Sequence, residues 1–369
     1  MKIPIPNHLE HLSPYVPGKP IEETERELGI TGVIKLASNE NPLGPSPRAI
    51  EAARAALAHV HLYPDGSSFH LRRALADHHN VHPEEVIVGN GSNDLIALLL
   101  QAFVHGDDEV LLSRGSFAIF KLAAQALGRK VVEVPMRDRF SIDVDAVADA
   151  LSPRTRLLFL DNPVNPTGTH FGRPELERLL GKISQSTIVV MDEAYFEFAH
   201  AADYPDSTEL RRDFSNLVTM RTFSKIHGLA GLRLGYALCD RWIAGYVDRA
   251  RPPFNVSSVA QAAGIAALGD LDHQKKSRTV AIEGVAFLTR ELRAQGFVVP
   301  DSQGNFVLCD FGVPAKPVCD ALLRAGVIVR PIANYGFANA ARISAGTAAE
   351  CERLVRALGE LKKRGLFAR

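Results

Sequence analysis

The alternation of short apolar segments with helical segments most limits how this 369-residue chain can fold. The segments "EVIVG", "DEVLLS", "KVVEVPM", "RLLFLDNP", "TIVVMDEAY" and "NLVTMRTFS" each have the length and composition of a buried strand. Stretches such as "FAIFKLAAQALG" and "PELERLLGKIS" lie between them and are typical of helices. Short apolar strands separated by helices indicate an α/β fold, in which helices cover both faces of a mostly parallel sheet.

The pattern changes near residue 270, where the long helical segment "HQKKSRTVAIEGVAFLTRELRAQG" leads into a smaller set of strands and helices. The beginning of the chain is rich in proline and glycine, which is typical of an irregular arm. We therefore predict an N-terminal arm at residues 1–35 that joins the small domain. A large α/β domain should follow at residues 36–270, and a small α+β domain at residues 271–369.

The charge balance argues against a partner recognised through bulk charge, because 42 basic residues face 42 acidic ones. Neither a nucleic acid nor a membrane surface is expected to bind. The N-terminus lacks the apolar core of a secretory signal, and the uncharged stretch at residues 254–269 is too short and polar to span a bilayer. The four cysteines have neither C-x-x-C nor metal-ligand spacing. We expect a cytoplasmic protein without a bound metal.

Glycine and polar residues gather where the strand "EVIVG" ends. Ligands of open parallel sheets bind beyond the carboxyl ends of the strands. Residues 90–93, "NGSN", open a helix there, and backbone N–H groups at a helix start can bind an anion. The third glycine of G-x-G-x-x-G is replaced by Asp94, and G-x-x-x-x-G-K-[ST] is absent. The segment predicts a phosphate site of neither the dinucleotide nor the P-loop type, with a plain helix cap as the alternative.

Three further strands end in side chains suited to binding and catalysis. Taken singly, each set has a structural interpretation as a turn, an ion pair or a helix cap. The side chains are Asn162 and Asn165, then Asp192, Glu193 and Tyr195, and then Thr222, Ser224, Lys225 and Arg233.

Together, these side chains match the parts of pyridoxal phosphate. A lysine amine can condense with its aldehyde, a carboxylate can pair with its ring nitrogen, and an anion cradle can hold its phosphate. Lys225 lies among glycines with no carboxylate near it in sequence, which favours a reactive role. Phe117, just beyond "DEVLLS", is placed to cover the ring face. The residues thus predict a pyridoxal phosphate site with Lys225 as its covalent anchor.

An ordered set of motifs runs through nearly the whole chain: "KLASNENPLGPSP", "LYPDG", "GNGSND", "DNPVNPTG", "MDEAYFEF", "TFSKIHGLAGLRLGY", "RPPFNVSSVAQAA" and "RISAGT". By these motifs the sequence resembles the fold-type-I pyridoxal-phosphate aminotransferases, and among them most closely the histidinol-phosphate aminotransferases. The resemblance implies a reversible transamination in histidine biosynthesis. L-histidinol phosphate and 2-oxoglutarate would give imidazole acetol phosphate and glutamate.

The resemblance also implies roles for single residues. Lys225 would bind the cofactor covalently and move a proton, and Asp192 would pair with the ring nitrogen. Asn165 and Tyr195 would hydrogen-bond the ring 3-oxygen. The residues expected to hold the phosphate are Gly91, Ser92, Asn93, Thr222, Ser224 and Arg233, together with Tyr63 reaching across the interface of a homodimer.

Substrate contacts are expected from four residues. The resemblance implies that Arg342 in "RISAG" binds a carboxylate and that Asn39 in "SNEN" lines the substrate site. Arg330 in "VIVRP" and Tyr15 in the arm are further candidates, because one site must accept both a phosphate and carboxylates. A surface strand residue is the alternative interpretation of Arg330. The chain departs from the pattern at Phe117, where many relatives carry a tyrosine; stacking is kept but a hydroxyl is lost.

Other functions stay open at this point. An aromatic amino-acid (phenylalanine) aminotransferase would show nearly the same motifs. A threonine-phosphate decarboxylase would use the same cofactor and the same lysine. From a different class, the fold also serves as a ligand-sensing module of transcription regulators; that function needs an added DNA-binding segment, whereas this sequence starts directly with the arm.

Overall fold

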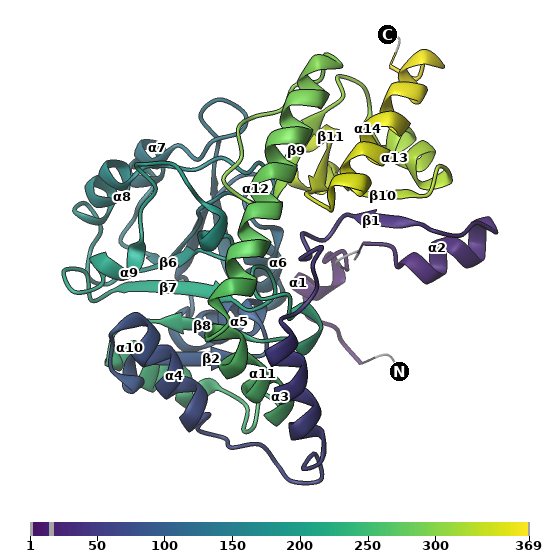
Figure 1. Cartoon of the computed structure of the whole chain (residues 1–369). Coiled ribbons are helices and arrows are strands. Elements are labelled where there is room, and N and C mark those ends of the chain that lie inside the picture. The colour runs from purple at the N-terminus through teal and green to yellow at the C-terminus, as the bar shows by residue number, and fades with distance from the viewer. Residues whose placement is uncertain (1–2, 15–17, 368–369) are drawn as a thin grey trace.

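The computed structural model describes residues 3–14 and 18–367. Its larger sheet has seven strands in the order β2-β8-β7-β6-β5-β3-β4 (Figure 1). The strands are β2 (Val86–Gly89), β3 (Glu109–Ser113), β4 (Lys130–Val134), β5 (Thr155–Asp161), β6 (Ile188–Asp192), β7 (Leu217–Thr222) and β8 (Gly235–Leu238). All run parallel except β8, which pairs antiparallel with β2 and β7. The predicted α/β class is confirmed, whereas strand β8 is an element that the apolar pattern does not predict.

Helices cover both faces of this sheet because side chains alternate along each strand. Leu157 and Phe159 of β5 pack in the core formed with α5, α6 and α10, whereas Leu158 and Leu160 pack in the core formed with α7 and α8. These helices are α5 (Ser92–Phe103), α6 (Ala118–Ala126), α7 (Val144–Asp149), α8 (Arg173–Leu180) and α10 (Arg241–Ala250). A third core lies under α3 (Pro47–Leu57), α4 (Phe69–His79) and α11 (Ser258–Leu268).

The smaller sheet has four strands in the order β1-β10-β11-β9. They are β1 (Ile34–Leu36), β9 (Phe306–Asp310), β10 (Val327–Ile332) and β11 (Phe337–Ser344). Strand β1 comes from the N-terminal part of the chain and runs parallel to β10. It follows the short helices α1 (Asn7–Glu10) and α2 (Ile21–Leu28). The N-terminal segment thus contributes to the small sheet, while the predicted domain boundaries stay a prediction.

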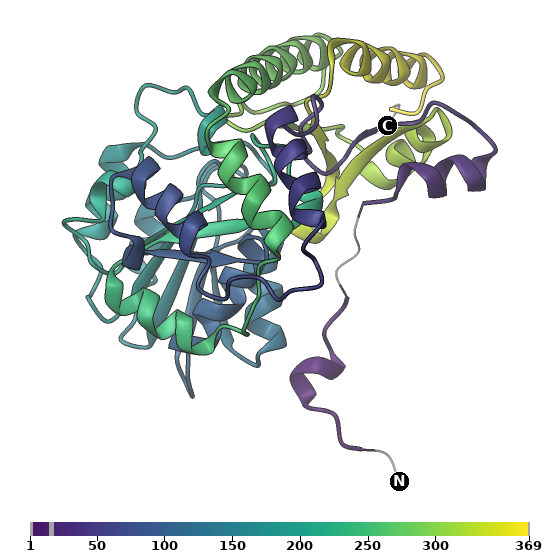
Figure 2. The same cartoon turned by 60° about the horizontal axis from the view of Figure 1, so that its bottom comes forward.

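The long helix α12 (Leu271–Ala294) and helix α14 (Ala348–Lys363) both pack over the smaller sheet (Figure 2). They share a core with α13 (Ala315–Arg324), which precedes β10. The remaining short elements are α9 (Ser207–Leu210), η1 (Pro83–Glu85), η2 (Phe196–Phe198), η3 (Ala230–Leu232) and η4 (Ala333–Tyr335). None of the helices in the described ranges is long and apolar enough to cross a membrane.

Candidate active site

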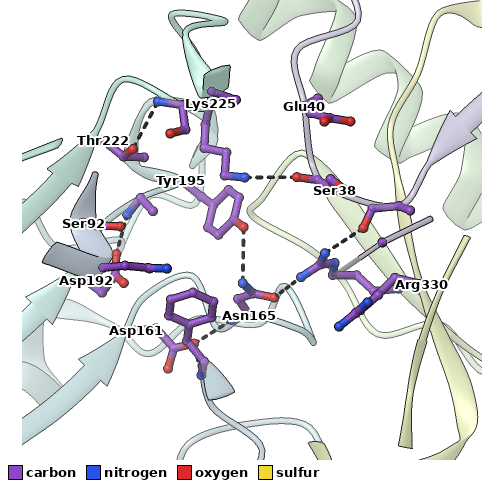
Figure 3. Close-up of a pocket in the computed structure, with 18 of the residues that line it drawn as sticks. Ser38, Glu40, Ser92, Asp161, Asn165, Asp192, Tyr195, Thr222, Lys225 and Arg330 are labelled. Atoms are coloured by element: carbon purple, nitrogen blue, oxygen red, sulfur yellow. Dashed lines mark hydrogen bonds between the residues drawn. The ribbon is translucent and has the colours of Figure 1, made fainter. Parts of the chain in front are cut away.

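A cavity of about 250 Å³ lies where β5, β6 and β7 end and where β10 and β11 approach them. Its volume is near the lower end of small-molecule pockets, which hold roughly 300–1,000 Å³. Figure 3 shows side chains from both sheets pointing into it. Among the predicted residues, its walls include Ser92, Asn93, Phe117, Asn165, Asp192, Tyr195, Thr222, Ser224, Lys225, Arg233, Arg330 and Arg342.

The predicted residues that do not line this cavity lie in different places. Gly91 is the N-cap of α5 and directly precedes Ser92, which lines the cavity. Tyr63 is 83% exposed and stacks on Phe254, with ring centroids 4.8 Å apart. Asn39 is fully buried next to the cavity. Tyr15 lies outside the described residues, so its substrate contact stays a prediction.

Lys225 follows β7 and places its amine inside the cavity. Its Nζ donates to the backbone oxygen of Ser38 at 3.1 Å (Figure 3). Burial and the positive charge of Arg342 lower the pKa of Lys225 to about 7. About half of these amines are then neutral at pH 7, where an ordinary lysine is almost fully protonated. A neutral amine is the form that attacks an aldehyde or accepts a proton.

Asp192 ends β6 at the same edge of the sheet. Its Oδ1 accepts from the backbone N–H of Ala194 at 3.1 Å. Burial raises the pKa of Asp192 to about 7, and the charge of Lys225 acts against that rise. A cation brought next to this carboxyl would favour its ionised form further. The cavity thus contains an amine and an acid whose pKa values both lie close to 7.

Tyr195 is the centre of a hydrogen-bond network that joins the two sheets. Its hydroxyl accepts from Asn39 Nδ2 at 2.9 Å and from Asn165 Nδ2 at 3.4 Å. The oxygen of each amide is also used: Asn165 Oδ1 accepts from Arg342 at 2.5 Å, and Asn39 Oδ1 accepts from Ser344 at 2.8 Å. The amide of Asn39 is thus occupied by its hydrogen bonds to Tyr195 and Ser344. Its predicted contact with substrate stays a prediction.

The start of α5 and the segment after β7 approach each other closely at the place where the sequence predicts a phosphate site. Gly91 has a φ of 80°, and a Cβ added there would come within 2.4 Å of Arg233 Nη2. A Cβ on Gly235 would come within 2.6 Å of the backbone nitrogen of Ser92. Only glycine therefore lets the guanidinium and the helix start approach so closely. Ser92, Ser224 and Arg233 all line this part of the cavity, and such hydroxyl, helix-start and guanidinium groups are suited to bind a phosphate.

Two arginines face the cavity from the smaller sheet. Arg330 on β10 and Arg342 on β11 are directly opposite each other in the antiparallel register. Arg342 donates to Asn165 and to the backbone oxygen of Ala37, while its buried Nε has no partner among the described residues. Like charges opposite one another destabilise a sheet. An anion between them would offset that repulsion and would give Nε an acceptor.

Several cavity residues, among them Ser38, Glu40, Asp161 and Tyr335, are not among the residues predicted from the sequence, and Asp161 is the one that ends a strand of the large sheet. It ends β5, is buried, and lines the cavity. The sequence pattern pointed to Asn162 at this strand end instead, but both ends of the Asn162 amide bond the backbone of Phe171. The alternation along β5 offered a signal, because Leu157, Phe159 and Asp161 occupy the same face.

A protein-family model for aminotransferase class I and II matches residues 31–358. A histidinol-phosphate aminotransferase of Anaeromyxobacter sp. (strain Fw109-5) is 56% identical over 358 residues, 97% of this chain and 98% of the relative. Histidinol-phosphate aminotransferase 2 of Methylococcus capsulatus is 46% identical over 94% of this chain and 95% of that protein.

Among solved structures, the histidinol-phosphate aminotransferase of Sinorhizobium meliloti in complex with pyridoxal-5'-phosphate superposes with a TM-score of 0.89. It is 29% identical, and the match covers 98% of each chain. The resemblance identified in the motifs, and the fold that it implied, are therefore confirmed. The chain belongs to the aminotransferase class I and II family.

Proposed function

We propose that this chain is a pyridoxal-phosphate-dependent aminotransferase that exchanges the amino group of L-histidinol phosphate with 2-oxoglutarate. The products would be imidazole acetol phosphate and glutamate, and the reaction would be reversible. The observation that carries the proposal is the cavity itself, in which the amine of Lys225, the carboxyl of Asp192 and an anion cradle meet. The relatives that match along nearly the whole chain support the choice of substrate.

The residues of this cavity fit pyridoxal phosphate. Its phosphate matches the cradle that Gly91 and Gly235 leave open next to Arg233. Its ring nitrogen matches a carboxyl, Asp192, which would be stabilised as an anion by a neighbouring cation. Phe117 lines the same cavity and offers an aromatic face for stacking. The Sinorhizobium meliloti relative, which shares the fold, contains this cofactor.

Bound pyridoxal phosphate supplies an aldehyde that condenses with amines and a ring that accepts electrons from the substrate carbon. The chain's own residues supply proton transfer and orientation. Lys225, with a pKa of about 7, is a base able to take a proton from the substrate carbon and to return it nearby. Tyr195 and Asn165, fixed through Asn39 and Arg342, are the residues that would offer hydrogen-bond donors to the cofactor ring.

The paired arginines would allow one site to bind both substrates. Histidinol phosphate carries a phosphate and no carboxylate, whereas glutamate carries two carboxylates. Arg330 and Arg342 lie opposite each other on β10 and β11 and line the same cavity. Two guanidinium groups can hold either a dianionic phosphate or a carboxylate through paired N–H groups. This pair is therefore suited to both halves of the reaction.

The steady-state rates with histidinol phosphate, phenylalanine and threonine phosphate test the proposal. We expect histidinol phosphate to have the highest kcat/KM, and Arg330→Ala to reduce this value more than the value for phenylalanine. Arg324→Ala is the matched control, because Arg324 is an exposed arginine at the end of α13. Equal or better use of phenylalanine by the unmodified enzyme would refute the substrate assignment. An equal loss for both substrates in Arg330→Ala would refute its phosphate role.

We further propose that the enzyme is a cytoplasmic homodimer in which Tyr63 completes the phosphate cradle of the partner subunit. The segment around it exposes an unusual number of large apolar side chains, namely Leu57, Val60, Leu62, Tyr63 and Phe69. Exposed apolar patches of this kind mark interaction sites, and a symmetric dimer would bury the same patch on both copies. The four cysteines are all free, which is typical of a reducing compartment.

A mixing experiment tests the shared site. Tyr63→Ala and Lys225→Ala should each be impaired, since each homodimer lacks one group in both of its sites. When the two proteins are unfolded and refolded together, heterodimers would contain one site with both groups. For random pairing in a two-fold dimer, about a quarter of the wild-type activity should return. Failure of the mixture to exceed the average activity of its components would refute a shared site.

A further inference from the structure

Asp161 is a buried carboxyl of the cavity to which the proposed function gives no role. It ends β5 as Asp192 ends β6, and the two residues are paired in the register of the sheet. Neighbouring strands lie roughly 4.7–4.9 Å apart, and residues paired in a parallel sheet project on the same face. Two carboxyls therefore stand next to each other in the wall of one cavity.

The hydrogen bonds of Asp161 join two separate loops. Its Oδ2 accepts from the backbone N–H of Phe117 at 3.1 Å and from the backbone N–H of Asn165 at 2.7 Å (Figure 3). Phe117 follows β3 and precedes α6, whereas Asn165 lies beyond the end of β5. One oxygen thus holds the residue that can cover a ring and the residue that can bond its edge.

The environment of Asp161 favours a neutral carboxyl. Burial and the neighbouring carboxyl of Asp192 raise the pKa of Asp161 to about 8, although the hydrogen bond from the backbone N–H of Asn165 acts to lower this pKa. The buried Oδ1 has no partner in the part of the chain that the structure describes. A protonated carboxyl can accept both N–H groups at Oδ2 and carry its hydrogen on Oδ1. Asp161 therefore differs in chemistry from Asp192, which is suited to hold a negative charge.

We propose that Asp161 is a positioning residue that fixes Phe117 and Asn165 around the ring held in the cavity. This inference deepens the proposed function and rests on it. It requires an oxygen that accepts both backbone N–H groups, and it does not require a charge at position 161. An amide should therefore replace the carboxyl, whereas a methyl group should not.

The variants Asp161→Asn and Asp161→Ala separate these requirements. For each purified protein, we would measure the dissociation constant for pyridoxal phosphate, the visible circular dichroism per bound cofactor, and the melting temperature without cofactor. The circular dichroism reports how the ring is held, which a merely structural residue would leave unchanged at saturation. Asp310→Ala is the matched control, because Asp310 is also a buried aspartate that ends a strand, β9, and accepts a backbone N–H.

We expect Asp161→Asn to stay within about threefold of wild type in cofactor affinity, with an unchanged dichroism spectrum, because the amide oxygen still accepts both bonds. Asp161→Ala should weaken cofactor binding roughly tenfold or more, since two backbone donors lose their acceptor. Its dichroism at saturating cofactor should change in shape or fall by about half. Asp310→Ala should lower the melting temperature and leave both cofactor measurements as in wild type.

Each result decides between the proposed function and the positioning role. If wild type binds no pyridoxal phosphate, the proposed function fails and this inference fails with it. If wild type binds it and Asp161→Ala matches wild type in affinity and dichroism, only the inference is overturned. A loss of tenfold or more in Asp161→Asn would also overturn it, because charge would then be the requirement. Should the alanine variant not fold, Asp161→Ser replaces it, since the shorter hydroxyl cannot reach both donors.

Discussion

The amine of Lys225 should react with pyridoxal phosphate at neutral pH far faster than an ordinary lysine. We would measure this reaction as a function of pH in wild type and in the variant Arg342→Gln. Burial is the main reason that the pKa of Lys225 falls, and Arg342 is the charge that lowers it most beyond that. Glutamine keeps a donor for Asn165 but removes the positive charge. The pKa of the amine should then rise by about 1, at the lower end of what one nearby charge causes.

The size of the effect follows from the two pKa values. With a pKa of about 7, half of the amines are neutral at pH 7. With the ordinary value of 10.5, about 1 in 3,000 is neutral, so the reactive fraction at pH 7 is about 1,500 times larger in the folded chain. The ratio of the two neutral fractions should fall steadily above pH 7, because the neutral fraction of Lys225 approaches its maximum while the neutral fraction of a free lysine keeps rising.

Stopped-flow mixing of the cofactor-free protein with excess pyridoxal phosphate measures this reaction through visible absorbance. The observed rate should rise with pH around a midpoint near 7 in wild type and near 8 in Arg342→Gln. Dividing by the rate of an Nα-blocked lysine at the same pH, after that rate has been divided by the neutral fraction of its own amine, removes the titration of the cofactor itself. Lys225→Ala should give no such change in absorbance, and Lys182→Ala, at an exposed lysine, should behave as wild type.

A wild-type midpoint above pH 9 would refute the reasoning, because burial would then not have lowered the pKa of Lys225. An unchanged midpoint in Arg342→Gln would leave burial as the cause and remove the role of the arginine. Both outcomes are obtained from the rate of cofactor binding alone, so neither depends on which substrate the enzyme uses.

Three further variants test other parts of the site. In Lys225→Met the cofactor-free protein should gain stability at pH 6 by up to about 4–5 kcal/mol, because the folded chain no longer buries an ammonium group. The gain in stability should disappear as pH rises from about 7 to 10.5, because in that range only the unfolded chain keeps the lysine protonated. Chemical denaturation at pH 6 and at pH 10.5 measures the difference. Asp192→Asn should keep the Ala194 hydrogen bond and the melting temperature, yet lower kcat by about 100-fold or more through loss of the negative charge. Arg221→Met should lower the free energy of unfolding by about 3–5 kcal/mol, because it leaves the buried Glu193 carboxylate without its partner.

The sequence is informative wherever local periodicity decides the structure. The strand ending at Asp192 can be located because its apolar run stops abruptly at an acid. The strand leading to Lys225 can be located because Leu217, Val218 and Met220 lie close together before a polar segment. A parallel sheet then brings such ends to one edge, whichever strands are neighbours. That rule is enough to gather the amine, the acid and the anion cradle from the order of residues alone.

Features that depend on register or on strand direction cannot be obtained in this way. Strand β8 is four residues long and runs antiparallel, and its residues merge in the sequence with the end of the lysine motif. The opposition of Arg330 and Arg342 depends on the pairing of β10 with β11, which no local pattern specifies. Asn39 bonds Tyr195 across 156 positions of the chain. Long-range contacts of this kind decide which polar residues position others and which remain available to a ligand.

The reactivity of this cavity and its cost to stability have the same origin. About half of the Lys225 amines are neutral at pH 7 because Lys225 is buried beside Arg342, and Asp161 favours its protonated form because it is buried beside Asp192. Opening the cavity to water would relieve both costs, but it would return the amine to the charged, unreactive form. A ligand that brings an anion to the cradle and a cation to Asp192 offsets the cost without admitting water. The folded chain should therefore be stabilised by the molecule that it activates, to an extent that grows as that molecule's concentration exceeds its dissociation constant.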